Sequence, residues 1–120
     1  DLLTRLPADA PLGVTFDVGH ANLSPLGPIE YARRLIAQLL DLRRAIVNVH
    51  LHDNRGQEDE HQVLGEGTVD FGQLLPLLRD EGGCGRFVIE RWEGRRTCLT
   101  RSRRWLGLER PRPAGAGAAR

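Results

Sequence analysis

The sequence contains no lysine, few aromatic residues and no long apolar run. All 17 of its basic residues are arginine, a bias that we interpret as a preference for codons rich in G and C rather than as a binding device. A membrane span needs about 18 or more consecutive apolar residues. No run approaches that length, so a membrane role has no support. The first residues lack the basic start and apolar run of a signal peptide, and we therefore expect a cytoplasmic location.

The sequence has only two cysteines, Cys84 and Cys98. They are too few and too irregularly spaced for a disulfide framework or a zinc finger, and they suit a reducing compartment. The net charge of +1 and the aromatic content of 5% argue against a DNA enzyme, which generally presents a basic face with aromatic or polar wedges. What remains, 120 residues of which 40% are hydrophobic and 28% charged, is typical of one small globular domain.

Strand and helix patterns alternate along the chain. Short apolar, partly β-branched runs predict buried strands, and apolar residues at steps of three and four predict helices. A helix end and an exit loop are predicted for residues 1–11, and polar loops for residues 19–28 and 54–68. Asp70 stands where a helix N-cap is expected. The predicted order is strand 12–16, helix 29–43, strand 45–51, helix 71–81, strand 86–89 and helix 97–107.

Repeated βα units with apolar strands predict a parallel sheet covered by helices. We expect the α/β class, a partial (β/α)8 TIM barrel made of about three C-terminal βα units with parallel strands. Because a full barrel takes about 250 residues, the chain is expected to be a fragment or to be completed by another copy. We assign residues 1–107 to this barrel portion and the low-complexity residues 108–120 to a disordered tail.

Each predicted strand delivers acidic or imidazole side chains at its carboxyl end. Asp17 and His20 follow the first strand, His50 ends the second, and Glu90 follows the third. Strand ends of this kind carry the ligand sites of α/β proteins, and imidazole with carboxylate suits zinc, manganese or cobalt. Simpler explanations exist for each residue, because an aspartate after a strand often caps a loop and a core histidine often bonds a neighbour. In a strand buried on both faces, however, an inward His50 needs a partner, and a metal ion is one.

The polar loop after the second strand holds further candidates. His52 and Asp53 are interpreted as supporting or structural residues. Asp59 and His61 are separated by one residue, a spacing that lets both side chains meet one ion if the loop folds over the site. The alternative is an acidic loop that faces water, because glutamates flank the pair.

Four segments together resemble a known superfamily. They are residues 16–22 (FDVGHAN), 49–54 (VHLHDN), 59–71 (DEHQVLGEGTVDF) and 88–90 (VIE). In this order and spacing they resemble the xylose-isomerase-like TIM-barrel superfamily. It includes sugar phosphate isomerases and epimerases, and also endonuclease IV, the metal-dependent enzyme that nicks DNA at abasic sites. The resemblance covers about residues 12–92.

The resemblance implies roles for four residues in these segments and for Arg55, which directly follows the second segment. Asp17, His50 and Glu90 match ligands of a divalent metal ion, which would be Mn, Co, Mg or Zn, and Glu90 also matches an acid/base carboxylate of the epimerases. His20 matches a substrate-contacting histidine in the epimerases and a metal ligand in the endonuclease. Arg55 resembles an epimerase arginine that holds substrate hydroxyls.

The resemblance also implies a second metal ion, and it has gaps. Asp59 and His61 match the Asp-x-His ligands of a further metal in the endonuclease. A ligand glutamate from an earlier strand has no counterpart in the chain, nor do two earlier histidines of the endonuclease.

Three functions remain open at this stage. The first is a metal-dependent sugar or sugar-phosphate isomerase or epimerase, in which carboxylates pass a proton next to a carbonyl; its second acid/base carboxylate is missing here. The second is an abasic-site phosphodiesterase with a zinc cluster, supported by the Asp-x-His pair and by the arginines after Glu90. The third is an inactive truncated fragment. The expected partners are a small sugar, with nucleic acid as the less favoured ligand, and a second copy or a separate N-terminal half.

Overall fold

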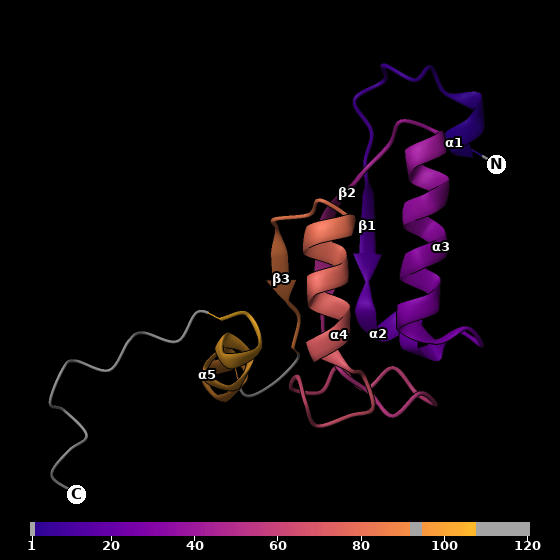
Figure 1. Ribbon diagram of the computed structural model, residues 1–120. Helices are drawn as coiled ribbons and strands as arrows, with labels where there is room; N and C mark the ends of the chain where they lie inside the picture. The colour runs from indigo at the N-terminus through magenta and orange to yellow at the C-terminus, as the bar shows by residue number, and fades with distance from the viewer. Residues whose placement is uncertain (1, 92–94, 108–120) are drawn as a thin grey trace, which may run out of the picture.

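A computed structural model of the chain describes residues 2–91 and 95–107 (Figure 1). The tail predicted for residues 108–120 lies outside the described residues. Strands and helices alternate in the predicted order. The elements are α1 (Leu2–Arg5), β1 (Val14–Asp17), α2 (Val18–Leu23), α3 (Gly27–Asp41), β2 (Ile46–Leu51), α4 (Phe71–Pro76), a π-helical segment η1 (Leu77–Glu81), β3 (Phe87–Ile89) and α5 (Arg95–Trp105).

The three strands form one parallel sheet in the order β1-β2-β3. Asp17 lies in register with His50. Just beyond β3, the backbone N–H of Glu90 donates to the carbonyl of Leu51 at 2.9 Å. The strands therefore end at one edge of the sheet, and Figure 1 shows the long loop after β2 folded beyond that edge. The register brings the polar strand ends together.

One face of the sheet packs against α3, α4 and η1, and this contact forms the core. Each side chain at its centre is no more than 2% exposed, and burying such a side chain favours folding by about 1.5–3 kcal/mol. These side chains are Phe16, Val49 and Leu51 from the strands and Leu39, Leu74 and Leu78 from the helices.

A β-bulge at Val47 decides which way His50 points. The register of β1 against β2 skips Val47, which is 54% exposed. Ile46 and Val49, on either side of the bulge, are therefore both buried toward the helices, and the side chain of His50, 31% exposed, faces the other way. The prediction that this strand is buried on both faces was wrong, because the described core helices cover only the face of Ile46 and Val49.

Residues 19–23, the first part of the loop predicted for residues 19–28, belong instead to α2. Asp17 is its N-cap, and Oδ1 of Asp17 accepts the backbone N–H of His20 at 2.9 Å. The loop prediction was wrong here because this cap satisfies a free N–H of the first turn, while Pro25 comes only after the helix has ended. The short helix holds His20 at the same edge as Asp17.

The second predicted helix is confirmed but changes character midway. Asp70 caps α4 by accepting the backbone N–H of Gln73 at 3.1 Å. Pro76 lacks an N–H inside this helix, and the chain continues as η1, which ends where Gly82 donates to the carbonyl of Leu77 at 3.0 Å. Within the two described ranges, no helix is long and apolar enough to cross a bilayer.

Candidate functional site

Asp17, His50 and Glu90 form what we call the strand-end group. They stand at the carboxyl ends of β1, β2 and β3. Nδ1 of His50 lies 3.1 Å from Oε1 of Glu90 and 3.8 Å from Oδ2 of Asp17. One ligand atom from each residue lies within 4.8 Å of the others, close enough to share one metal ion. The side chains are between 19% and 35% exposed, so a small molecule can reach them.

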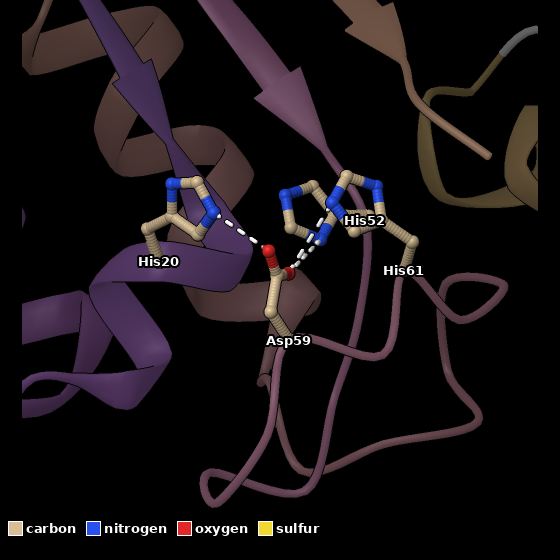
Figure 2. Close-up of side chains that lie close together, drawn as sticks. All are labelled: His20, His52, Asp59 and His61. Carbon is tan, nitrogen blue, oxygen red and sulfur yellow. Dashed lines mark hydrogen bonds and ion pairs between the residues drawn. The ribbon is translucent and has the colours of Figure 1, made fainter. Parts of the chain in front are cut away.

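His20, His52, Asp59 and His61 form what we call the loop group (Figure 2). The carboxylate of Asp59 lies among three imidazole rings. Its Oδ2 is 2.9 Å from Nε2 of His20. Its Oδ1 is 3.3 Å from Nε2 of His61 and 3.8 Å from Nδ1 of His52. Three imidazoles with one carboxylate are a ligand set that zinc and similar transition metals accept.

His52 is the one fully buried member of these two groups, with 0% of its surface exposed. Its Nε2 lies 2.7 Å from Oδ1 of Asp17. The ring of His61 stacks on it with centroids 3.8 Å apart and planes 6° from parallel. Gly19 lies against the ring, and a Cβ there would sit 2.0 Å from Cε1 of His52. Only glycine allows the backbone of α2 to approach the ring this closely.

Asp53 holds the loop that supplies Asp59 and His61. Its carboxylate is fully buried. It accepts hydrogen bonds from four backbone N–H groups, at distances of 2.9 to 3.2 Å; the donors are Asn54, Gly65, Gly67 and Val69. The backbone of Asp53 also pairs with that of Gln62 in both directions, at 2.9 and 2.8 Å. Both the side chain and the backbone of Asp53 therefore close the loop on itself, and the four donors satisfy the buried carboxylate.

Asn54 ties the same loop to α2. Its Nδ2 donates to the carbonyl of Gly19 at 2.9 Å, and its Oδ1 accepts from Nδ2 of Asn22 at 2.8 Å and from the backbone of Gly56 at 2.9 Å. Asn54 is fully buried. These bonds fix the distance between α2, which carries His20, and the loop, which carries the other ligand candidates.

The electrostatics of the groups favour ionised aspartates and a protonated His20. Burial opposes ionisation of both Asp17 and Asp59, but hydrogen bonds from the histidines outweigh it and hold their pKa values below the ordinary 3.8. For Asp17 the bond comes from His52, aided by the backbone N–H of His20. The hydrogen bond to Asp59 raises the pKa of His20 above 6.5. The clustered anions therefore attract cations to this edge.

The structure brings together most of the residues that were predicted from the sequence. His20 lies with the proposed second metal pair, where its Nε2 is 2.9 Å from Oδ2 of Asp59, and its Nδ1 is also 3.5 Å from Oδ2 of Asp17 in the strand-end group. Arg55, predicted to hold substrate, pairs with Glu60 at 3.3 Å, and its side chain is 64% exposed. His52, interpreted as a supporting residue, lies inside the loop group. The sequence signal is a spacing of two from His50, which makes the two histidines look alike and does not tell which of them meets the loop.

Comparisons with known proteins show which family the chain belongs to. The model of the family described as xylose isomerase-like TIM barrel matches residues 1–119. The chain is 40% identical over 79 residues to the uncharacterized protein MJ1311 of Methanocaldococcus jannaschii, covering 66% of the chain and 25% of that protein. It is 38% identical over 47 residues to the L-ribulose-5-phosphate 3-epimerase UlaE of Escherichia coli, covering 39% of the chain and 16% of the epimerase.

The fold comparison agrees. The crystal structure of a D-tagatose 3-epimerase-like protein superposes with a TM-score of 0.62 and 32% identity, over 81% of this chain and 35% of that one. With the parallel sheet described above, this match confirms the prediction of a partial TIM barrel. The chain spans about a quarter or less of the curated relatives named here.

Proposed function

Because the chain belongs to the xylose isomerase-like TIM-barrel family, we propose that it supplies metal ligands and a proton-transferring carboxylate to a sugar or sugar-phosphate isomerase or epimerase. The observation that carries the proposal is the strand-end group. Three strands that are separate in sequence deliver an aspartate, a histidine and a glutamate to one small volume. The names of the similar proteins, an L-ribulose-5-phosphate 3-epimerase and a D-tagatose 3-epimerase-like protein, support a sugar as the substrate class.

The residues of the strand-end group fit a divalent cation. Asp17 and Glu90 bring two carboxylates to one imidazole, and the lowered pKa of Asp17 keeps its carboxylate ionised at neutral pH. A bound Mn, Co, Mg or Zn ion would polarise the carbonyl of an open-chain sugar and acidify the neighbouring C–H. Hard and borderline cations of this kind accept mixed oxygen and nitrogen ligands.

Glu90 is the residue that we assign to proton transfer. Its carboxylate lies at the open edge of the sheet, 35% exposed, where it can approach a substrate carbon. The nearby Nδ1 of His50, 3.1 Å away, orients it. In an epimerase a second carboxylate works on the opposite face of the same carbon, and the described groups offer no candidate for it. Arg55 is the proposed contact for substrate hydroxyls. In that role its guanidinium would leave the carboxylate of Glu60 and bind the sugar instead.

Deuterium exchange tests this assignment, because it detects proton removal without inversion. The purified chain is incubated with MnCl₂ and L-ribulose 5-phosphate or D-tagatose in D₂O, and NMR follows deuterium uptake at the carbon next to the carbonyl. We expect manganese-dependent exchange that the Glu90→Gln variant loses by at least about 100-fold, consistent with the usual contribution of a positioned acid or base. The Glu81→Gln variant is the control, because Glu81 is exposed and lies outside both groups. Exchange that persists in Glu90→Gln, or that ignores manganese, would refute the assignment.

The loop group favours a second candidate function, an abasic-site phosphodiesterase. Phosphodiester hydrolysis commonly uses adjacent metal ions, and His20, Asp59 and His61 offer ligands for an ion beside the strand-end group. Nicking of a duplex with one abasic site, measured in parallel with the sugar assay, distinguishes the two. Cleavage that requires zinc and is lost in His61→Ala would favour the phosphodiesterase; sugar exchange without cleavage favours the epimerase.

A further inference from the structure

His52 belongs to the loop group and also contacts the strand-end group. Its Nε2 meets Oδ1 of Asp17, in the strand-end group, at 2.7 Å. Its Nδ1 faces Oδ1 of Asp59, in the loop group, at 3.8 Å, and has no hydrogen-bond partner in the described chain. The two nitrogens of one ring are therefore divided between the two groups.

The two contacts determine which nitrogen of the His52 ring carries the hydrogen. An ionised carboxylate only accepts hydrogen bonds, so the short contact to Asp17 requires the hydrogen on Nε2 of His52. A neutral ring with this hydrogen presents a lone pair at Nδ1. That lone pair is buried and faces the oxygen of Asp59, itself an acceptor, and a buried polar atom in this position costs about 1–3 kcal/mol.

A cation between Nδ1 and Asp59 removes this cost, and a metal ion serves better than a proton. A proton on Nδ1 would have to bridge 3.8 Å, which is beyond hydrogen-bond distance. An ion with bonds of about 2.0–2.2 Å to nitrogen and oxygen can touch both atoms. Nε2 of His20 and Nε2 of His61 complete the same cluster.

The ring is held so that its nitrogens do not exchange partners. His61 stacks on one side of it at 3.8 Å, and the backbone of Gly19 lies so close to the ring that a Cβ would sit 2.2 Å from Nδ1. The ring belongs to a side chain with no exposed surface. A flip of the imidazole would need both neighbours to move.

We propose that His52 bridges the two groups, with Nδ1 as the fourth ligand of an ion in the loop group and Nε2–H bonded to the carboxylate of Asp17 in the strand-end group. This inference rests on the metal dependence in the proposed function. An ion on Nδ1 would fix the hydrogen on Nε2, and that hydrogen would hold Oδ1 of Asp17, while Oδ2 of Asp17 faces Nδ1 of His20 at 3.5 Å and Nδ1 of His50 at 3.8 Å. A carboxylate–histidine–metal arrangement of this type orients the carboxylate as well as the ring. Each ion therefore favours the binding of the other through His52, because such coupling is reciprocal.

Two substitutions of His52 separate its two contacts. In His52→Gln the side-chain amide reaches the position of Nε2 and still donates to Asp17, but it leaves nothing at Nδ1. In His52→Asn the amide oxygen takes the place of Nδ1, and the bond to Asp17 is lost. The control is Val49→Ala, because Val49 is also 0% exposed, lies on β2, which ends just before His52, and belongs to neither group.

Titration with Co²⁺, read by visible absorption, measures both groups. The loop group is read alone in a His50→Ala background and the strand-end group alone in a His61→Ala background. We expect His52→Gln to weaken cobalt binding by the loop group at least about tenfold and to shift its absorption bands, because one nitrogen ligand is lost. We expect His52→Asn to weaken the strand-end group about tenfold, although His52 does not belong to it. Val49→Ala should lower thermal stability and leave both affinities within about threefold.

Unchanged affinity of the loop group in His52→Gln, or of the strand-end group in His52→Asn, would overturn the bridge. So would equal losses of both affinities in both variants and in Val49→Ala, since that pattern marks a purely structural role. If the parent chain binds no cobalt, the proposed metal dependence fails and the bridge fails with it. Two ions bound with no response to His52 would overturn the bridge alone.

Discussion

Replacing Asp53 with asparagine should destabilise the chain more than any exposed substitution, because Asp53 anchors the loop that carries half of the site. Each carboxylate oxygen accepts two backbone N–H groups; Oδ2, for example, accepts those of Gly65 at 3.0 Å and Gly67 at 2.9 Å. Asparagine puts an NH₂ group in place of one carboxylate oxygen. The two hydrogen bonds to that oxygen are then lost, and two backbone N–H groups face the NH₂ group, which is itself a donor. At about 1.5–3 kcal/mol for each bond to a charged acceptor, the free energy of unfolding should fall by about 3–6 kcal/mol.

Urea unfolding followed by circular dichroism, with a chelator present, measures this loss without any contribution from metal. Asp80→Asn is the matched control, because Asp80 is 65% exposed and its ion pair with Arg79 is a surface pair, which contributes about 0–1 kcal/mol. Amide hydrogen exchange adds a local readout, since the N–H groups of Gly65 and Gly67 should lose protection first. A loss below about 1 kcal/mol in Asp53→Asn would show that the loop is held by other contacts and would refute the reasoning.

Two further predictions concern the metal-free chain. The raised pKa of His20 contributes stability that is present below pH 6.5 and is lost as the pH rises through the native pKa. The lowered pKa values of Asp17 and Asp59 contribute stability that is present above pH 3.8 and is lost as the pH falls through their native pKa values. Thermal unfolding in chelator should thus give the highest midpoint between these values, and His20→Gln should flatten the alkaline decline; a parallel decline in the variant would contradict this. Gly19→Ala should lower the free energy of unfolding by about 1–3 kcal/mol, because the added methyl group would clash with the ring of His52. Gly85→Ala, with nothing within 4 Å of the added carbon, should change it by about 0.5 kcal/mol or less. Equal effects of the two substitutions in urea unfolding would contradict a clash between residue 19 and His52.

The sequence predicted the strand ends well because their pattern is local. An apolar run followed by Asp17, His50 or Glu90 can be recognised without knowing the partner strand, and parallel pairing then brings such ends together. The cap at Asp70 is equally local, since it depends on a residue three positions away. The expectation of a sugar epimerase came from the family resemblance, because the spacing of apolar residues predicts strands and helices but no substrate.

The bulge at Val47 was missed because it depends on a neighbouring strand that the sequence does not identify, and α2 was missed because its local signals conflict. A bulge is a property of two strands in register, and nothing in the β2 sequence marks Val47 as the extra residue. Gly13, the residue before β1, is consistent with the bulge, because a Cβ there would sit 2.3 Å from Cγ1 of Val47. For α2, glycine and asparagine favoured a loop, and the cap from Asp17 outweighed them.

The role of His52 could not be predicted for a different reason: it depends on where a long loop returns. His50 and His52 look equivalent in the sequence, and only the return of the loop places Asp59 and His61 against one ring and not the other. Asp53, immediately after His52, fixes that return through hydrogen bonds from the backbone N–H groups of Gly65, Gly67 and Val69. The ligand atoms of the loop group already lie within 4.8 Å of one another, so binding an ion requires little ordering of the chain. If the loop group binds an ion as proposed, we expect metal affinity and folding to be separable in this domain, unlike in a zinc finger, where the metal itself drives folding. Substitutions at Asp53 should then act on stability first and on metal binding only as a consequence.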